Sequence, residues 1–268
     1  MDLVLLAKAA VMGVVEGLTE FLPISSTGHL IIAEHWLGTR SDTYNVVIQA
    51  GAILAVTLIY GRRIIELLTG WRQPDNRDYL LKIIIAFLVT AVLGVVIKKL
   101  GFELPTAITP VALALIVGGV WMLVAEALAG KMPDSAKVTV RVAIAVGLAQ
   151  IVAAIFPGTS RSAATIFIAM LLGTTNRAAA TDFAFLVGIP TMFAASGLEI
   201  YNQIKHGTAS ADWGMPVVVA FIASTVTAFI SVRWLLGFIR TNKFTPFALY
   251  RIVLGGALLS LAAMGVLG

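Results

Sequence analysis

The sequence contains no cysteine among its 268 residues, and only 12% of the residues are charged. The absence of cysteine excludes disulfide bonds, thiolate metal sites and thiol nucleophiles. The low charge content and the hydrophobic content of 59% exclude an ordinary water-soluble domain, in which about 25% of residues are charged. Basic loops of a membrane protein explain the formal net charge of +5, so we expect no nucleic-acid partner.

The first residues also lack the basic segment that opens a secretory signal peptide. Met1 to Leu3 carries no positive charge, and Glu16 and Glu20 interrupt the apolar run where a cleavage site would fall. We therefore expect this N-terminal segment to be part of the mature protein.

Apolar runs long enough to cross a bilayer recur along the whole chain. A helix needs about 20 residues to cross about 30 Å of hydrocarbon, whereas a barrel strand would alternate polar and apolar residues. The pattern predicts an all-α polytopic membrane protein with a single membrane domain, 1–268. Helices are expected over ten ranges: 3–21, 25–37, 43–60, 80–98, 106–127, 138–155, 159–172, 180–200, 216–236 and 246–267.

Two of these ranges, 25–37 and 159–172, are too short to span a bilayer, and each follows a helix that ends at a proline. Pro23 and Pro157 therefore predict two re-entrant helical hairpins, which leave about six transmembrane helices. The alternative is that each proline only kinks a continuous helix.

The two hairpins resemble each other in sequence, because GVVEGLTEFLPISS from Gly13 is answered 134 residues later by GLAQIVAAIFPGTS from Gly147. We interpret the match as an internal duplication with halves of approximately 1–134 and 135–268. Since each half has one hairpin and three crossings, the second half must enter the membrane from the opposite side, which predicts an inverted repeat. The matched special residues are Gly13 with Gly147, Glu16 with Gln150, Pro23 with Pro157, Ser25 with Thr159, and Ser26 with Ser160.

The basic residues predict the orientation of the helices. Twelve lie on one side, namely Arg62, Arg63, Arg72, Arg77, Lys82, Lys131, Lys137, Arg141, Arg177, Arg233, Arg240 and Lys243. Five lie on the other side, namely Lys8, Arg40, Lys98, Lys99 and Lys205. Because cytoplasmic loops carry the excess of Lys and Arg, we expect the loop 61–80 in the cytoplasm and both termini outside. The tips of the two hairpins then meet near the midplane.

The helix starts that follow the prolines are predicted to bind an anion. Unpaired N–H groups and the positive end of a helix dipole attract negative charge, and Arg161 adds a guanidinium group suited to phosphate oxygens. The predicted ligand is a phosphate or polyphosphate. Arg161 is expected to act with Ser25, Ser26, Thr27, Gly158, Ser160, Ser162 and Thr165. The alternative for the hydroxyl groups is helix capping.

Glu16 and Glu20 are four residues apart, on one helix face within the hydrophobic span. Two like charges cannot both remain bare there, so either one is protonated or the pair faces a cation such as Mg²⁺, Ca²⁺ or Arg161. His29 follows Ser26 by three residues on the same face of the short helix, within reach for proton exchange with a hydroxyl or leaving group. A purely structural role for His29 is the alternative.

Asp182 and Arg251 are each placed a few residues inside the cytoplasmic start of a predicted helix. One interpretation is that they form an ion pair with each other. The other is that Arg251 binds the substrate.

The stretches EGLTEFLPISSTGH and PGTSRSAAT together resemble the undecaprenyl-diphosphate phosphatase (bacitracin-resistance) family of bacterial membrane enzymes. The first fits the acidic ExxxE pattern of the family and the second its PGxSRSxxT pattern. The FTPFALYR stretch near the C-terminus and the order of the segments also agree, so that the resemblance covers essentially the whole chain.

The resemblance implies removal of the terminal phosphate from undecaprenyl (C55) diphosphate, which recycles the lipid carrier for peptidoglycan synthesis. It also implies a homodimer in the bacterial inner membrane, a site open to the periplasmic side, and dependence on a divalent cation. Carried over by position, the functional residues of the family become Glu16, Glu20, Ser26, His29, Ser160, Arg161 and Thr165.

Two mechanisms are open at this point. In one, Ser26 attacks the phosphate and gives its proton to His29 or Glu20, while Glu16 and Glu20 hold a metal ion. In the other, His29 is the nucleophile. A flippase or ion-coupled transporter for polyprenyl phosphate is the alternative function, because inverted repeats with broken helices are also typical of transporters. A candidate nucleophile beside a phosphate site favours the enzyme.

Overall fold

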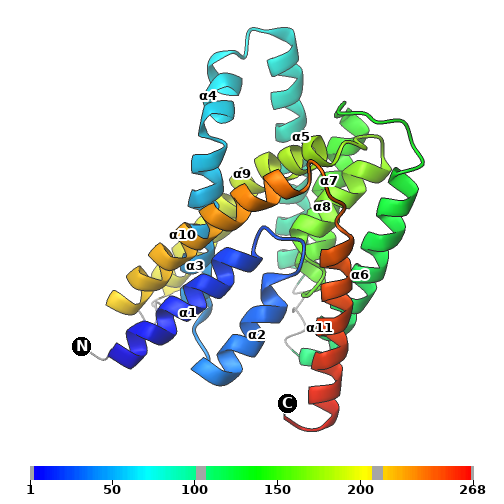
Figure 1. The fold of residues 1–268 in the computed structure, drawn as a ribbon. Helices are drawn as coiled ribbons and strands as arrows, with labels where there is room; N and C mark the ends of the chain where they lie inside the picture. Colours follow the sequence, from blue (N-terminus) through cyan, green and yellow to red (C-terminus); the bar gives the residue numbers. More distant parts are fainter. Residues whose placement is uncertain (1–2, 101–106, 207–213, 267–268) are drawn as a thin grey trace.

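The computed structural model describes residues 3–100, 107–206 and 214–266, and the regular elements within them are all α-helices (Figure 1). The described residues contain six helices long and apolar enough to cross a membrane. These are α3 (Asp42–Ile59), α5 (Pro74–Lys99), α6 (Ile108–Ala129), α9 (Arg177–His206), α10 (Met215–Phe238) and α11 (Thr245–Ala263). The prediction of an all-α polytopic membrane protein with about six transmembrane helices is thereby confirmed.

Four other helices form two consecutive pairs. The first pair is α1 (Leu3–Thr19) with α2 (Ser26–Leu37), and the second is α7 (Val140–Ile155) with α8 (Arg161–Leu171). The two members of each pair pack against each other, and α1 turns back into α2 at mid-height in the view of Figure 1. Their re-entrant position in a membrane stays a prediction.

The segment 61–80 was expected to be a loop, and this expectation is wrong. It contains α4 (Gly61–Thr69) and about the first two turns of α5, which begins at Pro74 rather than at residue 80. Alpha-4 is a short amphipathic helix that packs Leu67 into the main apolar core and leaves charged side chains outside. The N–H groups in the first turn of a helix have no hydrogen-bond partner within the helix. Proline, which lacks this N–H, is therefore well tolerated there. The expected helix ends at 106 and 267 lie outside the described residues.

The halves of the chain pack onto each other in a reciprocal way. The first helix of one half, α1, packs on α10 of the other, and α7 packs on α5. Matched glycines allow both contacts. A Cβ at Gly13 would lie 2.1 Å from the carbonyl oxygen of Ala220, and one at Gly147 would lie 2.7 Å from that of Ala86. This reciprocity is the packing that an internal duplication predicts.

Adjacent glycines of α11 provide a matched test of helix packing. A Cβ at Gly255 would lie 2.7 Å from the carbonyl oxygen of Ala112 in α6, whereas a Cβ at Gly256 would meet no atom within 4 Å. We expect Gly255→Ala to lower the free energy of unfolding by about 1–3 kcal/mol because α11 must move away from α6. Gly256→Ala is expected to leave it unchanged or raise it by up to about 1 kcal/mol, since alanine favours a helix. Unfolding of both variants in detergent measures the difference, and equal stabilities would contradict this packing.

Candidate active site

Two serines with left-handed backbone conformations precede the two short helices. Ser25 has φ 71° and directly precedes α2, and Ser160 has φ 68° and directly precedes α8. Among the described residues they are the only ones other than glycine with positive φ. Such a conformation costs on the order of 1–3 kcal/mol and persists only where surrounding contacts hold it.

The backbone conformations of the two predicted repeat halves match in a register one residue away from the sequence match. The sequence match paired Ser25 with Thr159, but Ser25 shares its conformation with Ser160. One more residue follows Pro157 than follows Pro23 before each short helix begins. Ser26 and Arg161 therefore have matching positions, since each is the first residue of a short helix and follows a serine with positive φ.

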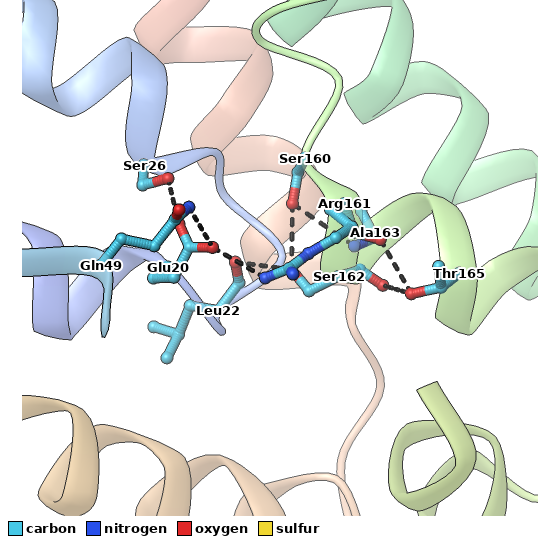
Figure 2. A network of polar contacts seen from close by, with 9 residues as sticks. All are labelled: Glu20, Leu22, Ser26, Gln49, Ser160, Arg161, Ser162, Ala163 and Thr165. Carbon is cyan, nitrogen blue, oxygen red and sulfur yellow. Dashed lines mark hydrogen bonds and ion pairs between the residues drawn. The ribbon is translucent and has the colours of Figure 1, made fainter. Parts of the chain in front are cut away.

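The carboxylate of Glu20 joins these two helix starts (Figure 2). Ser26 Oγ donates a hydrogen bond of 2.5 Å to Glu20 Oε2, and Arg161 Nη2 donates one of 2.7 Å to Glu20 Oε1. Gln49 of α3 donates to the same Oε1 at 3.3 Å. The carboxylate is 6% exposed and the Arg161 side chain 20% exposed, so a strong charge-assisted contact lies in a nearly dry setting. Residues 141 positions apart in sequence thus meet at one buried carboxylate.

The hydroxyl groups of the second motif connect backbone segments. Ser162 Oγ donates to the carbonyl oxygen of Leu22 at 3.0 Å and shares a hydrogen bond with Ser160 Oγ. Thr165 donates to the carbonyl oxygen of Arg161 at 2.8 Å. Ser162 therefore ties the loop before α8 to the loop before α2, a contact visible in Figure 2.

The two helix starts differ in capping. Ser160 accepts a hydrogen bond from the amide of Ala163 and so caps α8. Ser25 makes no side-chain cap on α2. Because its N-cap residue makes no such bond, the first N–H groups of α2 are more available to an anion than those of α8.

A cavity of about 660 Å³ reaches this polar cluster. Its walls are mainly small and apolar residues of α5, α7 and α9. At its exposed end lie Lys98 and Glu199, whose charged atoms are 3.7 Å apart. Of the predicted site residues, the cavity is lined by Glu20, Ser25, Ser26, Thr27, Gly158, Ser160 and Arg161. Glu16, His29, Ser162 and Thr165 lie outside its lining.

Glu16 lies in the interior, 2% exposed, and its Oε2 atom has no hydrogen-bond partner among the residues that the structure describes. The charged groups that interact electrostatically with Glu16 are Glu20 and Arg161. The described residues contain no cluster of three or more acidic, histidine or cysteine side chains with the geometry of a metal site. Mg²⁺ usually takes one or two carboxylates together with substrate phosphates and water, so the unpaired oxygen of Glu16 beside Glu20 fits such an ion.

Both ring nitrogens of His29 contact groups other than the Ser26 hydroxyl. Nδ1 lies 2.8 Å from the carbonyl oxygen of Ser25, and Nε2 lies 2.7 Å from the hydroxyl of Tyr250 in α11. The two rings are also stacked, with centroids 5.6 Å apart. The hydrogen-bond acceptor that Ser26 contacts is Glu20. Of the two acceptors proposed from the sequence for the Ser26 proton, the geometry favours Glu20.

The expected ion pair between Asp182 and Arg251 is absent. Asp182 accepts a hydrogen bond of 2.5 Å from Tyr60, and burial, followed by the Asp182 charge, raises the pKa of Tyr60 so that it remains a donor. Arg251 is fully buried and donates to the carbonyl oxygens of Ala114, Leu115 and Gly158. The sequence places Asp182 and Arg251 at a similar depth in the membrane. Depth alone does not indicate which neighbouring helix each side chain faces, and the two side chains face different helices.

Polar residues of the cavity that sequence reasoning missed are Gln49, Thr90, Gln150 and Thr191. Gln150 donates to Thr90 Oγ1 at 2.8 Å and to Thr191 Oγ1 at 3.4 Å. A signal for Gln150 was present, because it is the repeat partner of Glu16. Gln49 carried a weaker signal, as a single amide in the apolar run of α3.

Together these features define a polytopic helical membrane protein with an interior polar site suited to a phosphate group. The chain matches the family described as Bacitracin resistance protein BacA over residues 9–257, and it belongs to this family. It is 62% identical over 260 residues to an undecaprenyl-diphosphatase of Rhizobium etli, with 97% of this chain and 98% of that protein covered. It is 61% identical over 254 residues to an undecaprenyl-diphosphatase of Xanthomonas oryzae pv. oryzae, with 95% and 96% covered.

Proposed function

We infer that this protein is an undecaprenyl-diphosphate phosphatase, which converts undecaprenyl diphosphate into undecaprenyl phosphate and inorganic phosphate. The family and the curated relatives that carry this name over nearly the whole chain support the activity. One geometric observation carries the inference at the level of residues: Ser26 and Arg161 contact the two oxygens of the same buried carboxylate, at the polar end of a mainly apolar cavity. A lipid diphosphate has a charged head group and an apolar chain, so its binding site must offer both a charged region and an apolar path.

In the proposed mechanism, Arg161 and the uncapped N–H groups at the start of α2 bind the terminal phosphate. The guanidinium group is permanently charged and matches the geometry of phosphate oxygens. Its contact with Glu20 holds it at the place where the substrate arrives. As the bond to the leaving phosphate lengthens, these donors stabilise the charge on the transferred group.

Ser26 is the proposed nucleophile and Glu20 the proposed base. Ser26 Oγ forms a bond to the terminal phosphorus and gives its proton to Glu20, and the bond from that phosphorus to the bridging oxygen breaks. Undecaprenyl phosphate leaves with the bridging oxygen. Glu20 passes the proton to the leaving bridging oxygen and is again a carboxylate. It then takes a proton from water as that water attacks the phosphoserine phosphorus; the bond from phosphorus to Ser26 Oγ breaks, Glu20 returns the proton to Oγ, and inorganic phosphate is released. The hydrogen bond of 2.5 Å between Ser26 and Glu20 supports this assignment of roles.

We further propose that Glu16 and Glu20 hold a divalent cation, Mg²⁺ or Ca²⁺. When bound, such an ion supplies positive charge that neutralises the phosphate oxygens. The unpaired Oε2 of Glu16 supports this proposal.

Replacement of Glu16 tests the cation site. Glu16→Gln is expected to weaken binding of Mn²⁺ or Mg²⁺ by about tenfold or more, because it removes one of only two anionic ligands. Calorimetric titration of the purified protein measures the affinity without relying on turnover. The control is Glu66→Gln, at a carboxylate of α4 that is 57% exposed. Equal cation affinity in the wild type and both variants would contradict the site.

The transporter alternative makes a different prediction for purified protein in detergent micelles, where no gradient exists. A phosphatase releases inorganic phosphate from undecaprenyl diphosphate under these conditions, and we expect such release in the presence of Mg²⁺ or Ca²⁺. Tight binding of the lipid without phosphate release, whichever divalent cation is added, would support a flippase or ion-coupled transporter instead.

We also propose that the protein lies in the bacterial inner membrane as a homodimer, with its site open to the periplasmic side. The basic-residue bias supports this orientation. The start of α1 and the end of α11 lie toward one end of the molecule, and α4 lies at the opposite end (Figure 1). This arrangement agrees with external termini and a cytoplasmic segment 61–80.

A further inference from the structure

Two consecutive residues of α11 are connected to the two loops that precede the short helices, one through a histidine of α2 and one directly. Tyr250 contacts His29 Nε2 at 2.7 Å, and His29 Nδ1 contacts the carbonyl oxygen of Ser25 at 2.8 Å. The next residue, Arg251, donates a hydrogen bond of 2.9 Å to the carbonyl oxygen of Gly158. One helix therefore reaches the first loop through a histidine and the second loop directly.

The contact with Ser25 determines the state of His29. A carbonyl oxygen only accepts, so Nδ1 must carry the hydrogen and donate it. In the neutral ring Nε2 is then an acceptor, which takes the hydrogen of the Tyr250 hydroxyl. The stacked rings, inclined by only 10°, hold the imidazole in this plane. Both nitrogens of His29 are thus engaged, Nδ1 with the backbone of Ser25 and Nε2 with Tyr250.

Arg251 is held just as firmly. It is 0% exposed, and besides Gly158 it donates to the carbonyl oxygens of Ala114 at 3.2 Å and Leu115 at 3.4 Å. Gly118 makes room for it, since a Cβ there would lie 2.1 Å from Nη2. No carboxylate forms a salt bridge with Arg251 in the part of the chain that the structure describes, so backbone carbonyl oxygens and the sulfur of Met122, 3.9 Å from Nη1, satisfy this buried charge.

We propose that Tyr250 and Arg251 are positioning residues that fix the two loops relative to each other. Ser25 directly precedes the nucleophile Ser26, and Gly158 lies three residues before Arg161. Both loops have positive φ at a residue next to the site, a conformation that needs outside contacts to persist. By holding these loops, the pair keeps Ser26 and Arg161 on the same carboxylate. His29 then acts on the backbone and not on the phosphate.

This proposal rests on the proposed phosphatase function and predicts a kinetic signature. A small displacement of Ser26 slows the chemical step, whereas the groups that bind the phosphate remain present. Loss of the positioning contacts should therefore lower kcat and leave KM within about twofold. A role in substrate binding would raise KM instead.

The test uses two conservative variants with matched controls. Tyr250→Phe keeps the ring and removes one hydroxyl, and we expect kcat to fall by about three- to tenfold, the typical worth of one hydrogen bond. Arg251→Lys loses the planar group that reaches several carbonyls, and we expect a decrease of about tenfold or more. The controls are Tyr201→Phe, at a tyrosine that is 59% exposed, and Arg72→Lys, at an exposed arginine between α4 and α5. Both controls should retain the wild-type kcat.

A double-mutant cycle separates positioning through His29 from a general loss of stability. His29→Gln keeps an N–H donor for Ser25, so it should retain at least about a tenth of kcat. In that background Tyr250→Phe should have no further effect, because its partner is already gone. Additive effects would overturn the proposal, and so would a loss in His29→Gln as large as that in Ser26→Ala.

The results that would refute the positioning role differ from the results that would refute the proposed phosphatase function. A wild-type protein that releases no phosphate would refute the phosphatase function. An active wild type with an inactive Ser26→Ala variant, in which Tyr250→Phe and Arg251→Lys behave like their controls, would refute only the positioning role.

Discussion

Replacement of Arg161 by alanine is expected to abolish hydrolysis while the fold persists. The guanidinium group lies 2.7 Å from Glu20 and is the only cationic side chain at the polar end of the cavity lining that the structure describes. Removal of a donor that stabilises the charge of the transferred group lowers kcat by on the order of 100-fold or more, about 2.7 kcal/mol. Arg161→Lys should recover only part of this loss, because an ammonium group lacks the planar fork that matches phosphate.

Phosphate release by the purified variant measures this effect, and the melting temperature reports on the fold. Arg233→Ala is a suitable control, since Arg233 is an exposed residue of α10 whose guanidinium lies over Phe229. An Arg161→Ala variant that retains more than about a tenth of the wild-type activity, a loss below about 1.4 kcal/mol, would contradict the assignment.

Replacement of Glu20 by glutamine is expected to be nearly as severe. The amide still offers an oxygen to Arg161, but it does not take the proton of Ser26, so general-base catalysis worth about 10²- to 10⁴-fold is lost. The carboxylate is also the only group that contacts both Ser26 and Arg161 by hydrogen bonds in the described part of the chain.

A second buried ion pair offers a matched control for this variant. Glu126 is 5% exposed and accepts a bond of 2.6 Å from Arg177, away from the cavity lining. Glu126→Gln should lower stability about as much as Glu20→Gln does, and should leave turnover close to that of the wild type. Equal turnover in the two variants would show that the effect of Glu20→Gln is structural.

Much of the fold could be predicted from hydropathy. The third helix was expected over 43–60 and is observed at Asp42–Ile59, because its long apolar run and the flanking polar residues mark its limits. Helix α4 was missed because it has only nine residues and carries charged side chains on its exposed face. So short a helix is stabilised by the packing of Leu67 in the core and not by its length. The length of α9 was underestimated. The helix was expected over 180–200, but it begins at Arg177 and continues through Pro190 to His206.

The core of the candidate site could also be predicted, for a specific reason. The two proline-ended motifs match each other in sequence, and the predicted repeat placed both at one interior point, where the structure brings Glu20, Ser26 and Arg161 together. The contacts that proved wrong or were missed depend on which way a helix faces. His29 has its partner Tyr250 at a separation of 221 residues, which no local spacing reveals. Arg251 likewise faces α6 and the loop before α8, and not Asp182.

The central claim is that the serine at the start of α2 receives the phosphoryl group, with a carboxylate as its base. Rapid quenching of the enzyme with undecaprenyl diphosphate labelled in its terminal phosphate, in acid and in parallel in alkali, tests this claim most directly. We predict an acid-stable label on the peptide that contains Ser26, present in the wild type and His29→Gln and absent from Ser26→Ala. An acid-labile label that disappears with His29→Gln and persists in Ser26→Ala would identify a phosphohistidine and contradict the account.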